Sequence, residues 1–367
     1  MIGMKSGMLA LAGVLLLSSC HSANTVSTSE SILNTTVLEI ETTTEDNPIE
    51  TTEETTSEMD GLSDQDKVDF SLSPNEAGRV MVLMYHSIGE LDSSWEITPD
   101  AFRADLEYLY VNGYRPISLS KYAKGQIDTP AGYTPVILTF DDTNQNNFNL
   151  IETVGGLVID PNSALGIMEE FNKRYDDFNL TATFYVYGTN AFRQEQHVDY
   201  KLHYLVDNGY DLGNHTYNHA RLIESATPEE IQYQIGMMAS YIRKILPKYE
   251  MNTFSIPYGQ RPAGDLNDYL VSGEYNDVSY HHIALVEVGS YPSYSVFDRR
   301  FDYTAIPRIR ASNTDEFQES ADWFEYFEKN PQLRFISDGF KNVVAVPQDM
   351  LELIDTESLG DKALLAY

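Results

Sequence analysis

The chain has 367 residues, in which 24 lysines and arginines face 56 aspartates and glutamates, so the formal charge is −32. A charge this negative argues against nucleic-acid binding, which needs a basic surface that displaces counterions from phosphates. The single cysteine excludes an intrachain disulfide and a cysteine-based zinc finger. Past residue 20, no apolar run approaches the roughly 20 residues of a membrane-spanning helix.

Residues 1–20 have the pattern of a bacterial export signal. Lys5 precedes a short apolar stretch over residues 8–17, as in a secretory signal peptide. Leu17-Ser18-Ser19-Cys20 then resembles the lipobox of bacterial lipoproteins, in which cleavage before the cysteine leaves a diacylglyceryl group on its sulfur. The resemblance implies an exported protein that lipidated Cys20 anchors to the outer face of the cell membrane. An ordinary signal peptide that happens to contain a cysteine is the alternative.

Residues 21–78 are expected to form an extended spacer. Between Ser22 and Glu58, 16 of 37 residues are serine or threonine, and residues 21–70 hold 13 acidic side chains and one basic side chain. Such a segment cannot bury enough apolar surface to offset its loss of conformational entropy, and repulsion between like charges extends it. The sequence therefore predicts a disordered tether between the membrane and a folded domain.

Residues 79–367 are predicted to form one α/β barrel-like domain. Apolar runs typical of buried strands alternate with segments whose apolar residues recur at helical spacing, which indicates parallel βα units. Thr98 and Thr227 mark helix starts, because each hydroxyl can cap a helix whose first residue is proline. The expected strands are 80–85, 135–140, 181–186, 210–213, 253–256, 283–288, 303–307 and 342–346, and the expected helices begin near 99, 163, 198, 227 and 315.

Ionisable side chains follow three of these strands at their carboxyl ends, the edge of a barrel where active sites are built. His86 follows the first strand and Asp141-Asp142 the second, whereas His215 and His219 come after the fourth. Two histidines and one aspartate are the three protein ligands of a catalytic divalent metal, with a position left open for water. The other aspartate can act as general base toward that water. Together the three segments predict a metal-dependent hydrolase.

These segments resemble motifs of the polysaccharide deacetylases with a NodB-homology domain, carbohydrate esterase family 4. Residues 139–142, Thr-Phe-Asp-Asp, resemble the first motif, and residues 214–219, Asn-His-x3-His, resemble the second. Residues 254–259, Phe-Ser-Ile-Pro-Tyr-Gly, resemble the third. The resemblance extends over residues 79–347 and implies a distorted (β/α)7-type barrel.

The resemblance also implies a role for each side chain. Asp141 would be the catalytic base, while Asp142, His215 and His219 would hold a divalent metal. Zn²⁺ is the first expectation for this metal, although Co²⁺ and Ni²⁺ suit the same ligands. The third motif would line the substrate groove and contribute the backbone N–H of its tyrosine to an oxyanion hole, through Pro257, Tyr258 and Gly259.

The chain departs from the family pattern at three points. Thr143 stands where the first motif usually continues with glycine, and Ser255 stands where an arginine usually braces the catalytic aspartate. The late Leu-x-x-His that supplies the general acid is missing, since no histidine follows His282. A circularly permuted subgroup, which acts on poly-N-acetylglucosamine, carries this histidine early and tends to lack the arginine. Residues 84–88, Met-Tyr-His-Ser-Ile, resemble its early segment.

The general acid therefore has two candidate positions. We favour His86 in the early segment, and the alternative is His281 or His282, just before the strand expected at 283–288. If neither side chain acts as the acid, the protein would be a weakened or inactive relative.

The expected activity is removal of acetyl groups from N-acetylglucosamine units of peptidoglycan or poly-N-acetylglucosamine. An esterase acting on acetyl-xylan or another O-acetyl glycan is a rival. A lipoprotein that binds wall glycan without hydrolysing it is a second rival, which Thr143 and Ser255 favour. An insertion over 143–180 either covers the substrate groove or forms a surface loop away from it. Four aromatic side chains are candidates for sugar platforms or for the core: Trp95, Tyr185, Tyr187 and Tyr217.

Overall fold

The computed structural model describes residues 62–367 apart from 313 and 315–318. The signal peptide, Cys20 and most of the tether that the sequence predicts lie outside the described residues. Among the described residues, no helix is both long and apolar enough to cross a bilayer.

The folded part begins earlier than the expected boundary at residue 79. Residues 62–78 contain two short turns of 3-10 helix and pack on the barrel. The N–H of Asn75 donates to the carbonyl of Ile336 at 2.8 Å, and Ala77 is buried. The last part of the predicted spacer is therefore part of the domain, because backbone pairing across the sequence compensates for its polar composition.

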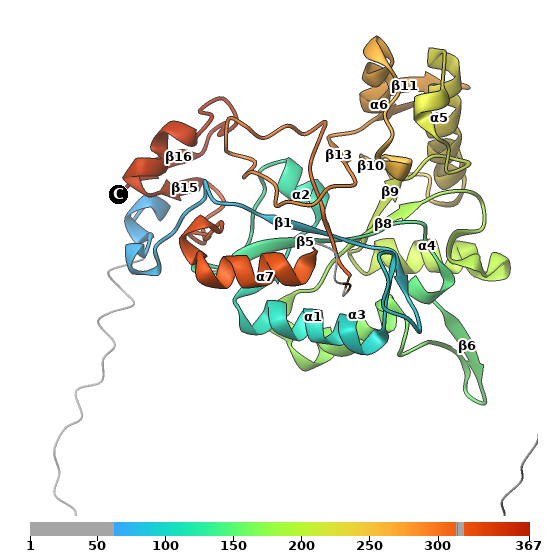
Figure 1. Ribbon diagram of the computed structural model, residues 1–367, viewed down its shortest axis with the longest axis horizontal. Coiled ribbons are helices and arrows are strands. Elements are labelled where there is room, and N and C mark those ends of the chain that lie inside the picture. The colour runs from blue at the N-terminus through green and yellow to red at the C-terminus, as the bar shows by residue number, and fades with distance from the viewer. Residues whose placement is uncertain (1–61, 313, 315–318) are drawn as a thin grey trace, which may run out of the picture. The chain divides into compact units, whose positions relative to one another are not determined.

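A parallel sheet of eight strands forms the centre of the domain (Figure 1). The strand order is β13-β10-β9-β8-β5-β1-β14, and β4 pairs with β5 outside this path. The strands are β1 Met81–Tyr85, β4 Tyr114–Pro116, β5 Thr134–Phe140, β8 Thr183–Val186, β9 Asp211–Asn214, β10 Thr253–Ser255, β13 Ala284–Val286 and β14 Ile309–Arg310.

The segment 306–310 joins the two edges of this sheet. Ile306 forms a parallel bridge with Val286 of β13, and Ile309 pairs in parallel with Leu83 of β1. The sheet is thereby curled toward a closed barrel, which confirms the expected distorted (β/α)7-type fold.

The strand expected at 303–307 is wrong in position. The side chain of Asp302 accepts the N–H of Thr304 at 2.8 Å and so forms a turn. Pro307 has no N–H to donate to a neighbouring strand. Regular pairing therefore starts only at Ile309.

Helices follow the strands and cover the sheet. Figure 1 shows α1, α3 and α7 along one face, and the rings of Tyr108 on α1 and Phe324 on α7 stack with centroids 4.3 Å apart. The expected caps are confirmed, since Thr98 accepts the N–H of Ala101 and Thr227 accepts that of Glu230. The helices are α1 Pro99–Val111, α2 Leu119–Ala123, α3 Ala164–Arg174, α4 Val198–Asp207, α5 Pro228–Ile245, α6 Asp268–Val271 and α7 Ser320–Lys329.

The central strands are apolar on both faces because both faces are covered. In β1, the side chains of Met81, Leu83 and Tyr85 pack in the core beneath the helices, whereas Val82 belongs to a second core on the opposite face. A parallel strand buried on both sides has a continuous apolar run, as in this sequence. The first polar side chains therefore come where the strand ends, and this fixes where a site can form.

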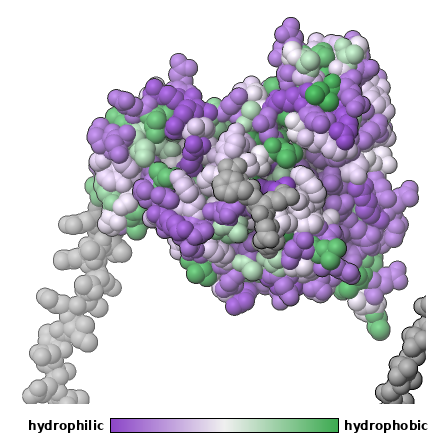
Figure 2. Space-filling model, in the orientation of Figure 1, coloured by the Kyte–Doolittle hydropathy of each residue, from purple (hydrophilic) through white to green (hydrophobic). Residues whose placement is uncertain are grey.

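Four small two-stranded sheets lie outside the barrel sheet among the described residues. Within the insertion over 143–180, β6 Leu150–Thr153 and β7 Gly156–Ile159 form an antiparallel hairpin that projects from the domain (Figure 1). Figure 2 shows apolar side chains at its tip, on a face that is mostly hydrophilic. The other pairs are β2 Ser87–Ile88 with β3 Glu96–Ile97, β11 Ser272–Tyr275 with β12 Val278–His281, and β15 Val343–Val346 with β16 Ala363–Ala366. The strand expected at 342–346 is present as β15, but it pairs with β16 in one of these sheets and not with a barrel strand.

Candidate metal and catalytic site

The carboxyl ends of three strands bring the expected site residues together. His86 follows β1, Asp141 and Asp142 follow β5, and His215 follows β9. The carboxyl ends of parallel strands share one edge of a barrel, so side chains far apart in the sequence meet there. These residues line a cavity of about 490 Å³ together with Ser87, Trp95, Asn144, His219, Tyr258 and Val288.

Asp142, His215 and His219 form a candidate metal site. Each offers one ligand atom, and the three atoms lie within 4.8 Å of one another. Oδ1 of Asp142 is 3.5 Å from Nε2 of His215 and 3.2 Å from Nε2 of His219, and this buried oxygen accepts no hydrogen bond from any described residue. A buried oxygen without a donor is costly, and a cation bound between these atoms offsets that cost. The three side chains therefore fit a divalent metal, with positions left for water and substrate.

Neighbouring groups orient both imidazoles toward Asp142. Nδ1 of His215 lies 2.8 Å from the carbonyl oxygen of Ser255, which can only accept, so Nδ1 carries the proton and Nε2 is left as a ligand. Nδ1 of His219 lies 3.0 Å from the hydroxyl of Tyr258. Burial lowers the pKa of His215, but Asp142 and Asp141 raise it overall, so a cation competes with a proton for Nε2.

The pKa of Asp142 also favours cation binding. Burial by itself raises this pKa, but His215 and His219 lower it well below its ordinary value. The carboxylate is therefore ionised and able to act as a ligand at neutral pH.

The backbone is strained where it turns into the site. Positive φ angles occur at Asp142 (69°), Thr143 (43°), Thr216 (67°), His219 (51°) and Tyr258 (60°). Each such residue costs of order 1 kcal/mol or more and is kept only where its surroundings hold it. Thr143 therefore adopts the left-handed conformation for which the family pattern has glycine, at an energetic cost that glycine avoids.

Residues from the segment after β8 hold this strained turn by hydrogen bonds. The N–H of Phe192 donates to the carbonyl of Thr143 at 2.8 Å, and the guanidinium of Arg193 donates to the carbonyl of Asp142 at 3.2 Å. Lys201 of α4 is completely buried, and its ammonium donates to the carbonyls of Phe148 at 2.6 Å and Phe192 at 3.2 Å. Sequence reasoning missed Arg193 and Lys201, which belong to no recognisable motif.

Asp141 is paired with an arginine that the sequence analysis did not find. Nη1 of Arg308 lies 2.7 Å from Oδ1 of Asp141, Nη2 lies 2.7 Å from Oδ2, and both side chains are buried. Ser255 donates its hydroxyl to Oδ2 at 3.0 Å. The inference that the bracing arginine is lost is therefore corrected: Ser255 does occupy the expected position, but Arg308, from the segment before β14, supplies the charge.

Arg308 also determines the ionisation of Asp141. Burial raises the pKa of Asp141, but the guanidinium more than offsets this and lowers the pKa to about 2. The carboxylate is therefore ionised at neutral pH, and its two oxygens are held in one plane by the bidentate contact.

His86 lies in the same cavity as the two aspartates. Its ring packs edge-on against Trp95 with centroids 4.7 Å apart, and Asn147 donates to its backbone carbonyl at 2.6 Å. Burial lowers the pKa of His86, while Asp141 and Asp142 oppose the shift. A histidine under the influence of two carboxylates can gain and lose a proton during a reaction.

The alternative acids, His281 and His282, do not line this cavity. His282 is completely buried, stacks on Phe254 with centroids 5.1 Å apart, and contacts the carbonyl of Leu270 through Nδ1 at 2.6 Å. Burial lowers its pKa to about 4. His281 is exposed on β12. The geometry thus supports His86 rather than either of these two.

Only some of the other expected groove residues line the cavity. Tyr258 lines the cavity, whereas Pro257 is buried beside it and Gly259 is exposed with a φ of 64°. Among the candidate platforms only Trp95 lines the cavity, with 48% of its surface exposed. The remaining candidates belong to the core or its edge: Tyr185 is completely buried, Tyr187 packs on His219, and Tyr217 packs against Tyr233.

The barrel and its strand-end cluster define an α/β protein with a candidate His₂Asp metal site beside a paired aspartate. Residues 129–271 match the family model described as polysaccharide deacetylase. This segment of the chain is therefore similar to polysaccharide deacetylases. The matched residues include the strand-end aspartates and the two candidate histidine ligands.

Solved structures of deacetylases are similar to this chain. The putative polysaccharide deacetylase BA0330 from Bacillus anthracis is 20% identical, with 68% of each chain covered and a TM-score of 0.50. IcaB from Ammonifex degensii is 17% identical over 68% of this chain and 97% of its own, with a TM-score of 0.47. The deacetylase PplD from Streptococcus pyogenes is 18% identical over 64% and 92%, also with a TM-score of 0.47. No curated protein matches the chain.

Proposed function

We propose that this protein is a metal-dependent hydrolase that removes acetyl groups from N-acetylglucosamine units of a cell-surface polysaccharide. One observation carries the proposal: Asp142, His215 and His219 converge beside the Asp141–Arg308 pair and His86 in one cavity. The match of residues 129–271 to the polysaccharide deacetylase model supports the substrate class. Peptidoglycan and poly-N-acetylglucosamine both contain the required unit.

The chemistry divides between the two sides of the cavity. A divalent cation held by Asp142, His215 and His219 supplies Lewis-acid activation of water and of the acetyl carbonyl when it is bound. Asp141 accepts the proton of the attacking water, and Arg308 keeps its oxygens oriented. As the carbon–nitrogen bond breaks, His86 donates a proton to the sugar nitrogen. The products are acetic acid and a free amine, which exchange a proton to give acetate and an ammonium group, and the proton taken by Asp141 balances the one given by His86.

Acetate release by the full chain tests this proposal. The substrates are N-acetylglucosamine oligomers, peptidoglycan and acetyl-xylan, each with and without a chelator. We expect release from the N-acetylated substrates, its loss with chelator, and a fall of roughly 100-fold or more for Asp141→Asn and His86→Ala. Release from acetyl-xylan alone would identify an esterase. No release from any substrate would favour the glycan-binding reading.

The His281→Ala variant is the matched control for the acid. Its ring is exposed on β12 and away from the cavity, so its activity should equal that of the wild type. An unaffected His86→Ala enzyme would end the assignment of His86 as the acid.

We also propose that Cys20 anchors the exported protein to the membrane. The support is the segment Leu17-Ser18-Ser19-Cys20 after a short apolar stretch. Fractionation of cells expressing the wild type and Cys20→Ser tests it. The wild type should be recovered with membranes and the variant should not, and equal recovery of both with membranes would contradict lipidation at this residue.

A further inference from the structure

A cavity of about 340 Å³, which we call the arginine cavity, is lined by Arg79 and Arg300 among mainly apolar side chains. Arg79 comes just before β1, whereas His86, which lines the catalytic cavity, comes just after this strand. The two cavities therefore lie at opposite ends of β1, and they share no lining residue. Val288 lines the catalytic cavity and Tyr291, in the same segment, lines the arginine cavity, so one polymeric ligand can reach both.

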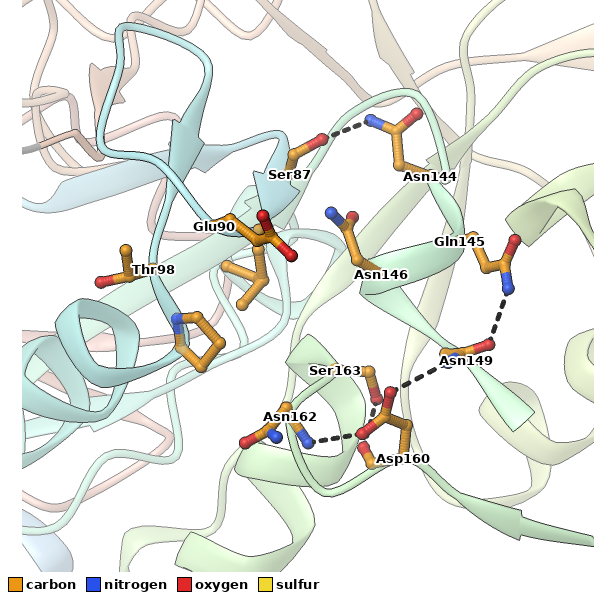
Figure 3. A pocket seen from close by; sticks show the side chains of 13 residues that line it. Ser87, Glu90, Thr98, Asn144, Gln145, Asn146, Asn149, Asp160, Asn162 and Ser163 are labelled. Atoms are coloured by element: carbon orange, nitrogen blue, oxygen red, sulfur yellow. Dashed lines mark hydrogen bonds between the residues drawn. The ribbon is translucent and has the colours of Figure 1, made fainter. Parts of the chain in front are cut away.

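A further cavity, of about 780 Å³, differs from the arginine cavity in place and in charge (Figure 3). It shares Ser87 with the catalytic cavity and continues it. Its wall carries the carboxylates of Glu90 and Asp160 and no lysine or arginine. The arginine cavity has the opposite pattern, since no aspartate or glutamate occurs among its lining residues. Of the two, only the arginine cavity suits an anionic ligand.

The protein holds both guanidinium groups of the arginine cavity in place. That of Arg79 lies 3.5 Å from the ring centroid of Tyr294 and donates to the carbonyl of Pro292 at 3.2 Å. That of Arg300 lies 4.2 Å from the same ring and is paired with Asp298, which is buried. Asp298 compensates the charge of Arg300, whereas no carboxylate of the described residues pairs with Arg79. A guanidinium has five N–H groups, so Arg79 keeps donors for an anion.

Aromatic and aliphatic side chains form most of the remaining wall. The rings of Trp323 and Tyr326 on α7 lie edge to face with centroids 5.3 Å apart, and Nε1 of Trp323 donates to the carbonyl of Ser290 at 2.9 Å. Tyr326 and Tyr291 expose 41% and 52% of their surface, so both rings are accessible to a ligand. The aliphatic members are Leu333, Met350 and Leu353. Such a wall offers few partners for the many hydroxyl groups of a bare sugar, but it suits apolar side chains beside a carboxylate.

We propose that the arginine cavity binds a carboxylate-bearing peptide attached to the polysaccharide, which makes peptidoglycan the substrate. This inference rests on the proposed function. The short peptides of peptidoglycan carry small apolar side chains and free carboxylates, whereas poly-N-acetylglucosamine carries neither. The planar guanidinium of Arg79 donates to the carboxylate, and the rings of Tyr291 and Tyr326 cover the apolar part of the peptide. The peptide is carried by a different unit of the strand from the one being deacetylated, because the two cavities are separate.

An anionic membrane fits the arginine cavity less well than a peptide does. Attraction to anionic lipid requires a cluster of several lysines and arginines. The cavity holds two arginines, one of them already paired with Asp298, on a chain of net charge −32. A concave site of this volume admits a single carboxylate with its neighbouring side chains, whereas a bilayer presents a broad surface.

Peptidoglycan strands with and without their peptides test the proposal on the full chain. An amidase removes the peptides from part of one preparation, so that the glycan is the same in both substrates. We expect kcat/KM for acetate release to be about two- to fivefold higher on the strands that keep their peptides, the range of one partly exposed charge pair. Arg79→Gln should remove this preference and Tyr326→Ala should reduce it. High salt should reduce the preference of the wild type.

Arg174→Gln is the matched control, because this arginine also stacks on a tyrosine but lines neither cavity. It should keep the preference. Titration calorimetry with a muramyl dipeptide as the probe gives a second reading that needs no turnover. Arg79→Gln should weaken this binding by a similar factor, and Arg174→Gln should leave it unchanged.

Equal kcat/KM on the two preparations in the wild type would overturn the proposal, and so would an Arg79→Gln variant that keeps the preference. Binding to phosphatidylglycerol vesicles that depends on Arg79, without a preference for peptide-bearing strands, would also overturn it in favour of a membrane site. Failure of the proposed function is distinguishable, because it would abolish acetate release from both preparations in every variant. Failure of this inference alone would leave release intact and equal on both.

Discussion

The buried pair of Asp141 and Arg308 ties the stability of the protein to pH. Burial raises the pKa of Asp141, and the guanidinium lowers it to about 2 from its ordinary value of 3.8. At about 1.4 kcal/mol per pKa unit, this shift contributes about 2.5 kcal/mol to the free energy of unfolding. Because the folded-state pKa is depressed, the contribution is complete above about pH 4 and is lost as the pH falls through 2.

Arg308→Met removes the charge while keeping most of the side-chain length. Asp141 then stays buried without its partner, so we expect the free energy of unfolding at pH 7 to fall by about 3–5 kcal/mol. Burial is no longer opposed, so the pKa of Asp141 rises and the acidic limb of kcat/KM moves to higher pH. Urea unfolding measures the first effect, and acetate release as a function of pH measures the second.

Two further variants make the result decisive. Adding Asp141→Asn to Arg308→Met removes the unpaired charge and should restore part of the lost stability, although activity stays low. Lys329→Met breaks an exposed pair with Glu325 and should cost less than about 1 kcal/mol. Losses that simply add in the double variant, or an acidic limb that does not move in Arg308→Met, would refute the reasoning.

Three other predictions follow from buried groups. Lys201→Met loosens the turn after Asp142 and should weaken Zn²⁺ affinity about tenfold by titration calorimetry, whereas unchanged affinity would contradict the positioning role. His282 has its pKa lowered by burial from 6.5 to about 4, so the free energy of unfolding should decrease by about 3 kcal/mol as the pH falls from 6.5 to 4. His282→Phe should remove that decrease, and a slope equal to the wild type would contradict it. Metal at 100 times its Kd should add about 2.7 kcal/mol to the free energy of unfolding, so its removal should lower the Tm. Asp142→Asn should show no metal-dependent change in Tm.

The sequence predicted the residues that lie at the ends of strands. Apolar runs buried on both faces end abruptly at His86 and Asp141, so the pattern showed where the chain reaches the edge of the barrel. His215 follows a short strand of mixed composition, where the signal was the spacing to His219. The order and spacing of these residues then indicated which side chains share one site. The helix caps at Thr98 and Thr227 could be recognised because capping depends on neighbouring residues alone.

Contacts between distant segments could not be predicted in this way. Arg308 is 167 positions from Asp141, and nothing near it in the sequence marks it as the partner of a carboxylate. The same holds for Lys201, whose role depends on two carbonyls from different loops. The β6–β7 hairpin did have a local signal, since Gly155-Gly156 lies between two short apolar runs, which is typical of a tight turn.

The position of Arg308 on the segment that closes the barrel has a consequence for the nascent chain. All of the aspartates and histidines of the site are synthesised before residue 220, yet the cation that neutralises Asp141 arrives nearly 90 residues later. A chain truncated before Ile306 would keep every recognisable motif. It would still lack the segment that closes the barrel and the positive charge of Arg308 beside Asp141. Only a chain that includes the barrel-closing segment can therefore form an active site.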